Sequence, residues 1–130
     1  MIEVLTSDSL PPPRFRYSPF VKAGPFIKSA GMIALVPGED VLEEGGVGAE
    51  TSRILNNLMT ALPDLGLDLG HIVSATIYTT VFEEFPEINR RWETVFTEDI
   101  RPPTRTALGV QNLPLGAKVE MDFLFYKEGS

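Results

Sequence analysis

The chain has 130 residues, of which 43% are apolar and 22% charged, as is typical of one globular domain with its own core. It contains no cysteine, which excludes disulfides, a thiol nucleophile and thiolate metal ligands. Its net charge of −7, with basic residues scattered along the chain, argues against binding to a nucleic-acid backbone. No apolar run suits a membrane span and the first residues show no signal-peptide pattern, so we expect a soluble cytoplasmic protein.

The first third of the chain is predicted to hold two short strands. A run of three prolines at 11–13 interrupts secondary structure, and residues 1–13 are expected to form a loosely held N-terminal arm. β-rich segments follow at Phe20-Val21 and over residues 26–36. Gly24-Pro25 between them indicates a turn.

The rest of the chain is predicted to alternate helices and strands. After an acidic, glycine-rich loop over residues 39–48, apolar residues recur at the spacing of one helix face. These residues are Ile54, Leu55, Leu58 and Leu62. Residues 72–80 favour a strand, and a second apolar helical stripe follows. That stripe consists of Phe85, Ile88, Trp92, Val95 and Phe96. Two last strands are predicted at 104–110 and 117–126.

The predicted order is β-β-α-β-α-β-β within a single domain over residues 1–130. With only two helices among the strands, we expect both to pack on one face of the sheet in an α+β fold. The other face of the sheet would then stay open unless a partner covers it. This open face is a first argument for an oligomer.

The last two predicted strands point to a site at Arg105. Alternate residues of the final strand form an apolar face: Val119, Met121, Phe123 and Phe125. Antiparallel pairing that matches the apolar faces of both strands places Arg105 beside Glu120 and Asp122, on the face without helices. The small Ala107 and Gly109 leave room next to Arg105, and this arrangement suits a small carboxylate ligand. A purely structural salt bridge is the alternative interpretation.

Other metal or catalytic centres are not indicated. His71 is the only histidine and follows a glycine at a predicted strand start, which is typical of a turn or surface residue. With one histidine and no cysteine, we do not expect a transition-metal site.

The segment before the last strands carries a distinctive pattern. It reads Arg101-Pro-Pro-Thr-Arg-Thr and is followed by Val110, Leu113-Pro114, Ala117 and Val119-Glu120. This pattern resembles the closing signature of the RidA (YjgF, L-PSP) family. Ser18-Pro-Phe-Val-Lys-Ala-Gly is similar to the family's proline-aromatic segment, and Ser29-Ala-Gly-Met-Ile to its Ser-Gly-Gln strand end. The resemblance covers nearly the whole chain.

The resemblance implies a chorismate-mutase-like α+β fold of the bacillus type, with a mixed sheet and two helices on one face. It also implies a homotrimer whose sheets line a central β-barrel, with three sites in the clefts between subunits. The implied activity is hydrolysis of reactive enamines and imines, such as 2-aminoacrylate, to a 2-keto acid and ammonia. No metal or organic cofactor is implied, and neither a membrane nor a nucleic-acid partner.

The same resemblance assigns roles to individual residues. Arg105 would bind the substrate carboxylate bidentately, and Glu120 would place or activate the attacking water near a backbone carbonyl at Ala107. Gly31 would let ligand atoms approach the backbone. Asn89 would hydrogen-bond near the cleft, with a plain helix-surface position as the alternative.

Three positions depart from the pattern of the family. Phe20, expected among the substrate-binding residues, keeps the ring of the tyrosine found in many active relatives but lacks its hydroxyl. Ala30 and Met32 replace a serine and a glutamine, so we expect a more apolar site with a shifted substrate preference or reduced activity on the smallest imines.

Two other functions stay open on the sequence alone. One is a non-catalytic module that binds small carboxylates or a protein partner, which the apolar replacements favour. The other is an endoribonuclease or translation inhibitor, against which the acidic chain argues.

Overall fold

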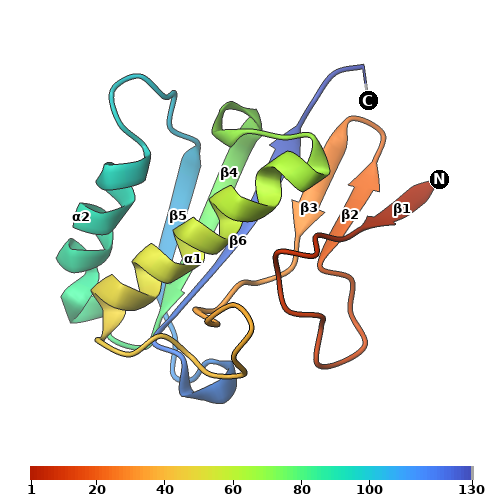
Figure 1. Cartoon of the computed structure of the whole chain (residues 1–130). Coiled ribbons are helices and arrows are strands. Elements are labelled where there is room, and N and C mark those ends of the chain that lie inside the picture. Colours follow the sequence, from red (N-terminus) through yellow and green to blue (C-terminus); the bar gives the residue numbers. More distant parts are fainter. Residues whose placement is uncertain (130) are drawn as a thin grey trace.

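A mixed β-sheet runs through the chain and carries the other elements (Figure 1). The computed structural model describes residues 1–129. Its strands are β1 (Ile2–Leu5), β2 (Phe20–Ala23), β3 (Phe26–Ser29), β4 (Ile72–Thr79), β5 (Thr104–Gly109) and β6 (Val119–Tyr126). They follow the order β1-β2-β3-β6-β4-β5, in which β4 and β5 are parallel and the other neighbours antiparallel.

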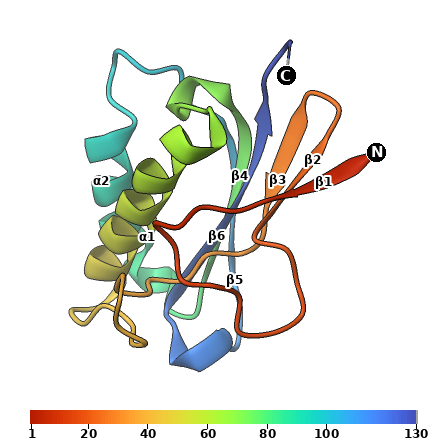
Figure 2. The same cartoon turned by 45° about the vertical axis from the view of Figure 1, so that its right-hand side comes forward.

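Two α-helices, α1 (Val47–Ala61) and α2 (Phe85–Val95), lie on the same face of this sheet (Figure 1, Figure 2). The short 3₁₀ helices are η1 (Leu62–Leu65), η2 (Leu69–His71), η3 (Phe82–Glu84) and η4 (Pro114–Gly116). The predicted α+β class, with a mixed sheet and both helices on one face, is confirmed. No helix within residues 1–129 is long and apolar enough to cross a bilayer.

The core lies between the two helices and the sheet. Alternate residues of β6 are fully buried in it, as the sequence pattern predicted: Val119, Met121, Phe123 and Phe125. α1 contributes Ile54 and Leu58, and α2 contributes Ile88 and Trp92. Truncating such a side chain to alanine costs about 2–5 kcal/mol of stability. The core therefore fixes β6, and with it the position of Glu120.

Two buried polar side chains hold β6 in place, one at its start and one near its middle. Glu50 on α1 accepts hydrogen bonds from the backbone N–H groups of Lys118 at 2.9 Å and Val119 at 3.2 Å. The hydroxyl of Ser29, at the end of β3, accepts one from the N–H of Phe123 at 2.8 Å. Buried polar groups are stable when they are paired in this way, so both contacts help to set the position of β6.

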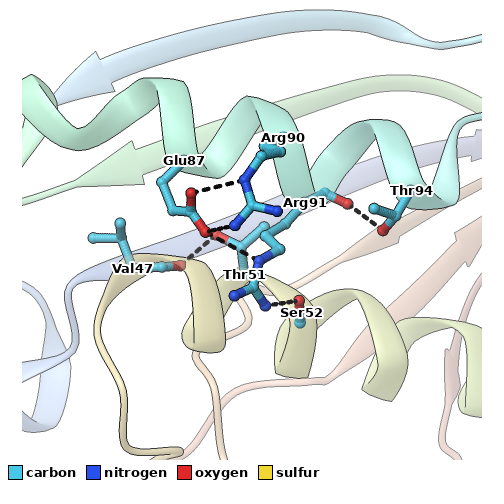
Figure 3. Close-up of polar contacts among 7 residues, drawn as sticks. All are labelled: Val47, Thr51, Ser52, Glu87, Arg90, Arg91 and Thr94. Carbon is cyan, nitrogen blue, oxygen red and sulfur yellow. Dashed lines mark hydrogen bonds and ion pairs between the residues drawn. The ribbon is translucent and has the colours of Figure 1, made fainter.

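Polar side chains also join the facing surfaces of α1 and α2 (Figure 3). Glu87 accepts hydrogen bonds from Arg90 Nε at 3.0 Å and Arg91 Nε at 3.1 Å, and Arg91 donates to Ser52 Oγ at 2.8 Å. The hydrogen bond from Arg90 is the main reason why the pKa of Glu87 is lowered. A Cβ at Gly48 would lie 2.5 Å from Glu87 Oε1, so the two helices approach closely here because residue 48 is glycine. These contacts orient α2 over the sheet.

The N-terminal third differs from the prediction in two places. Residues 1–13 were expected to be a loosely held arm, but Ile2–Leu5 form β1 and pair antiparallel with β2. The side chains of β1 are mostly exposed, so backbone pairing at the sheet edge defines this strand and no apolar alternation marks it. The next difference is that β3 ends at Ser29, because the chain beyond it makes isolated bridges in place of a continuous ladder.

The predicted antiparallel pairing of the last two strands was wrong. β4 lies between β5 and β6, and β5 pairs parallel with β4. β4, α2 and β5 form a βαβ unit, in which the helical crossover allows parallel pairing. Alternation along a strand shows which residues share a face, but it does not identify the neighbouring strand. The apolar Leu108 suggested a core face, yet its side chain is 38% exposed at the sheet edge.

Candidate functional site

The observed strand order places Arg105 on the helix side of the sheet. Arg105 pairs with Ala75 of β4, which is buried beneath the helices, so both side chains share that face. Glu120 pairs with Tyr78 of β4, whose side chain points to the opposite face. The prediction that Arg105 lies beside Glu120 and Asp122 within one chain was therefore wrong.

Arg105 packs against α2 and its N-terminal end, where it forms what we call the Arg105 cluster with Asn89, Phe85 and Trp92. The guanidinium carbon lies 5.3 Å from the ring centre of Phe85 and 5.2 Å from that of Trp92. Nη2 donates a hydrogen bond to Asn89 Oδ1 at 2.6 Å. Partial burial lowers the pKa of Arg105, and the charge of Glu93 acts in the opposite direction. Two rings and an amide thus fix the orientation of the guanidinium.

The guanidinium of Arg105 retains free donors. Within residues 1–129 no carboxylate forms an ion pair with Arg105, and Asn89 is the side chain that accepts a hydrogen bond from it. Arginine has five N–H donors in a fixed fork, so donors remain for a second acceptor. Ala107, two residues along β5, is half-buried and small and leaves this side of Arg105 uncrowded. A carboxylate bound by two parallel N–H groups fits such a fork.

Glu120 is the second charged group of the candidate site, and like Arg105 it forms no ion pair within residues 1–129. In the described part of the chain, no donor makes a hydrogen bond to its carboxylate. Burial is the main reason why the pKa of Glu120 is raised, and the nearby charge of Asp122 raises it further. A Cβ at Gly31 would lie 2.1 Å from Glu120 Oε2, so the carboxylate occupies space that only glycine leaves open. The absence of a side chain at Gly31 therefore allows Glu120 to take up its observed position.

Asp122, the other predicted carboxylate, has partners within the sheet. It accepts a hydrogen bond from the Tyr78 hydroxyl at 2.8 Å and forms an ion pair with Lys28 at 3.5 Å. That hydrogen bond is the main reason why the pKa of Tyr78 is raised. Asp122 therefore belongs to the structural pairing on the open face, whereas Glu120 remains available for a ligand or water.

A cavity of about 540 Å³ lies beside Glu120, and we call it the Glu120 cavity. Its walls are the N-terminal segment 10–15, residues 30–33 and Pro114-Leu115 before β6. Phe20 also lines it, with its ring 1% exposed and packed in the core. The Glu120 cavity is therefore apolar over most of its surface, with a carboxylate at one side.

The residues predicted from the sequence thus separate into two groups on one chain. Arg105, Asn89 and Ala107 lie around β5 and α2, whereas Glu120, Gly31 and Phe20 lie around the Glu120 cavity. The contribution of Phe85 and Trp92 to the arginine site was missed because their spacing indicated only a helix core face. Tyr17, which lines the Glu120 cavity, was missed because nothing in the irregular segment before β2 fixes its direction.

Within residues 1–129 no group of three or more histidine and acidic side chains could hold a metal ion. His71 was predicted to be a turn or surface residue; it is the last residue of η2, and its Nδ1 accepts a hydrogen bond from the N–H of Asp68 at 3.0 Å.

Comparisons with known proteins agree with this fold. A family profile described as Endoribonuclease L-PSP matches residues 7–126. A RutC family protein of Pyrococcus abyssi is 31% identical over 126 residues, covering 97% of this chain and 98% of the relative. The mouse 2-iminobutanoate/2-iminopropanoate deaminase is 29% identical over 120 residues, covering 92% and 87%. The crystal structure of RidA from an Antarctic Psychrobacter species superposes with a TM-score of 0.88 at 25% identity, covering 95% of this chain and 98% of that one.

Proposed function

The chain belongs to the Endoribonuclease L-PSP family, which includes RidA, and we propose that it hydrolyses reactive enamines and imines of 2-amino acids to 2-keto acids and ammonia. One observation carries this proposal. The chain presents an oriented guanidinium without a carboxylate partner and a half-buried carboxylate without a donor. These are the groups that a hydrolase needs to hold an anionic substrate and to activate water. The name of the mouse relative points to the same chemistry.

We further propose that the two groups meet between copies of the chain, in a homotrimer with three intersubunit sites. Arg105 and Glu120 point to opposite faces of one sheet, so a single chain cannot apply both to one small substrate. The face opposite the helices carries half-buried polar side chains and exposed apolar ones, including Leu108 and Val73. Such a face suits coverage by other copies, which would bring Arg105 of one subunit opposite Glu120 of the next.

In the proposed mechanism Arg105 holds the substrate carboxylate through two N–H groups, with Asn89 and the aromatic rings fixing its direction. The imine carbon is already electrophilic, so catalysis depends chiefly on positioning and on a water molecule. Ionised Glu120 takes a proton from that water as its oxygen attacks the imine carbon. Glu120 returns that proton to the nitrogen, which gives a tetrahedral aminoalcohol. It then carries the hydroxyl proton to the same nitrogen as the C–N bond breaks, so ammonia leaves and the 2-keto acid remains. The raised pKa of Glu120 suits a group that both accepts and returns a proton.

The test is release of 2-keto acid from freshly generated 2-aminoacrylate by the wild type, Arg105→Ala and Arg90→Ala. We expect Arg105→Ala to lower kcat/KM by about a thousandfold, the effect of removing one partner of a charged pair at a binding site. Arg90→Ala is the matched control, because Arg90 is an exposed arginine on α2 that pairs with Glu87. Undiminished turnover by Arg105→Ala would refute the proposal.

A non-catalytic carboxylate-binding module is the second candidate. It is favoured by Phe20, which has no hydroxyl, and by Ala30 and Met32, which add no polar group to the Glu120 cavity. Calorimetry with 2-keto acids beside the turnover assay separates the two functions, because binding without turnover selects the module. Although the family profile carries the name endoribonuclease, the net charge of −7 argues against RNA as the substrate.

A further inference from the structure

The Glu120 cavity is much larger than a three-carbon substrate requires. Its volume of about 540 Å³ lies within the range of pockets that enclose drug-sized ligands. 2-Aminoacrylate, whose side chain is a single methylene group, would fill only a small part of it. The excess space lies beside the carboxylate that is proposed to activate water.

Most of the lining of this cavity is apolar, and Glu120 adds a carboxylate to it. Residues that line the space include Met32, Ile33, Leu115, Tyr17 and the prolines of segment 10–15. Such surroundings stabilise an apolar group, whereas they leave most of a polar group without a hydrogen-bond partner.

Two other polar groups of the lining are already engaged. Asn57 donates to the backbone carbonyl of Leu35 at 2.8 Å, and Arg14 pairs with Asp40. Within residues 1–129 the Glu120 carboxylate has neither an ion pair nor a hydrogen-bond donor, so it is the charged group left for the reacting end of a ligand.

The outer wall of the cavity is anchored at both ends. Before it, the hydroxyls of Ser7 and Ser9 donate to Asp64 at 2.6 and 3.2 Å, and after it Arg14 holds Asp40. Proline at 11–13 restricts the backbone between these anchors. The space is thus largely formed before a ligand enters, which favours binding because little ordering remains to be done.

We infer that this site prefers enamines and imines with bulky apolar or aromatic side chains over the three-carbon imine, with the side chain in the Glu120 cavity. This inference rests on the proposed function. The reacting carbon lies at Glu120, the carboxylate of the substrate reaches Arg105 of the neighbouring copy, and the side chain extends toward Met32 and Leu115. Each additional CH₂ group that the cavity buries raises kcat/KM roughly fourfold. The imines of leucine and phenylalanine should therefore be preferred over that of alanine by at least about tenfold in kcat/KM.

The test compares imines generated in place by an L-amino-acid oxidase with catalase, from phenylalanine, leucine and alanine. The wild type is expected to favour the two larger imines by at least about tenfold in kcat/KM. Met32→Gln and Leu115→Asn should reduce that preference several-fold while the alanine-derived imine is still turned over. Asparagine is chosen at 115 because Leu115 has a φ of 58°, which asparagine tolerates. Met59→Gln, at an exposed position of α1 outside the cavity, is the matched control and should keep the wild-type preference.

A ratio of kcat/KM near one between the larger imines and the alanine-derived imine would overturn the inference but not the deaminase function. A larger ratio that neither cavity variant changes would do the same. If no imine is turned over, the proposed function fails, and calorimetry with phenylpyruvate and pyruvate decides on the cavity alone. Tighter binding of phenylpyruvate that weakens in Met32→Gln supports the cavity as a side-chain site. Equal binding of both acids, or binding of neither, overturns it.

Discussion

The Arg105 cluster and the Glu120 cavity each remove one charged group partly from water, but they do so in different ways. Arg105 is held by two ring faces and one amide, and it forms no ion pair within residues 1–129. Glu120 lies beside an apolar cavity and a second carboxylate, without any donor from residues 1–129.

The difference indicates a division of roles. Burial lowers the pKa of Arg105, but a guanidinium stays charged in proteins, so Arg105 can only bind and orient. Burial raises the pKa of Glu120 above its ordinary value of 4.5, which makes its carboxylate a stronger base toward water. In the proposed mechanism one region positions the substrate and the other transfers the proton, so neither is sufficient alone.

The largest expected effect comes from combining subunits that each lack one of these groups. Arg105→Ala and Glu120→Gln should each be nearly inactive as homo-oligomers. If the chain forms the proposed homotrimer, every mixed trimer holds one site with both groups intact, and activity should recover to about a third of the wild type. The two variants, co-expressed with different affinity tags and purified through both, are assayed for keto-acid release. Mixed oligomers as inactive as their parents would show that the two regions do not meet across subunits.

A single methyl group at position 31 should displace the Glu120 carboxylate and lower activity without unfolding the protein. The added Cβ of Gly31→Ala would lie 2.1 Å from Glu120 Oε2, so the carboxylate must move, whereas the backbone of Gly31 does not need a positive φ. We expect a loss of kcat/KM of about a hundredfold, close to that of Glu120→Gln, since the general base is misplaced. The thermal midpoint should change by only a few degrees. Gly70→Ala, in a distant turn, is the control, and full activity of Gly31→Ala would contradict this account.

The sequence predicted the contents of the two regions better than their arrangement. Alternation in β6 correctly assigned Val119, Met121, Phe123 and Phe125 to the core, and so assigned Glu120 to the opposite face. Both helices were found because their apolar spacing is long and regular. Arg105 was placed on the wrong face because the pairing of β5 depends on the crossover through α2, which no local pattern encodes.

Contacts between segments that are distant in the chain could not be predicted from the sequence either. The hydrogen bond between Arg105 and Asn89 joins residues 16 positions apart through the packing of α2 on β5. The Glu120 cavity requires segment 10–15 to fold back toward Pro114-Leu115, which the three prolines alone do not specify. The resemblance to the family did indicate an apolar site, because Ala30 and Met32 replace its serine and glutamine.

Asn89 allows the positioning role of the Arg105 cluster to be measured. Asn89→Ala removes the acceptor at 2.6 Å, so the guanidinium is less well oriented, and we expect KM to rise about tenfold with little change in kcat. Asn89→Asp keeps the shape but adds a charge that competes with the substrate carboxylate, so its KM should rise further. Steady-state kinetics on one imine separate the two parameters. A fall in kcat at constant KM would contradict a positioning role.

The smallest expected effect concerns the proton-transfer side. As a general base Glu120 must be ionised, so kcat/KM should fall as the pH drops below its raised pKa. Asp122→Asn removes the negative charge that is the second cause of that shift, while Asn still accepts the Tyr78 hydrogen bond. The pKa of Glu120 then falls and the acid limb of the pH profile moves to lower pH. Because burial is the larger cause of the shift, the midpoint of the acid limb should remain above pH 4.5. Glu39→Gln, an exposed loop carboxylate, should leave the limb in place, and a limb that moves to higher pH in Asp122→Asn would exclude Glu120 as the titrating base.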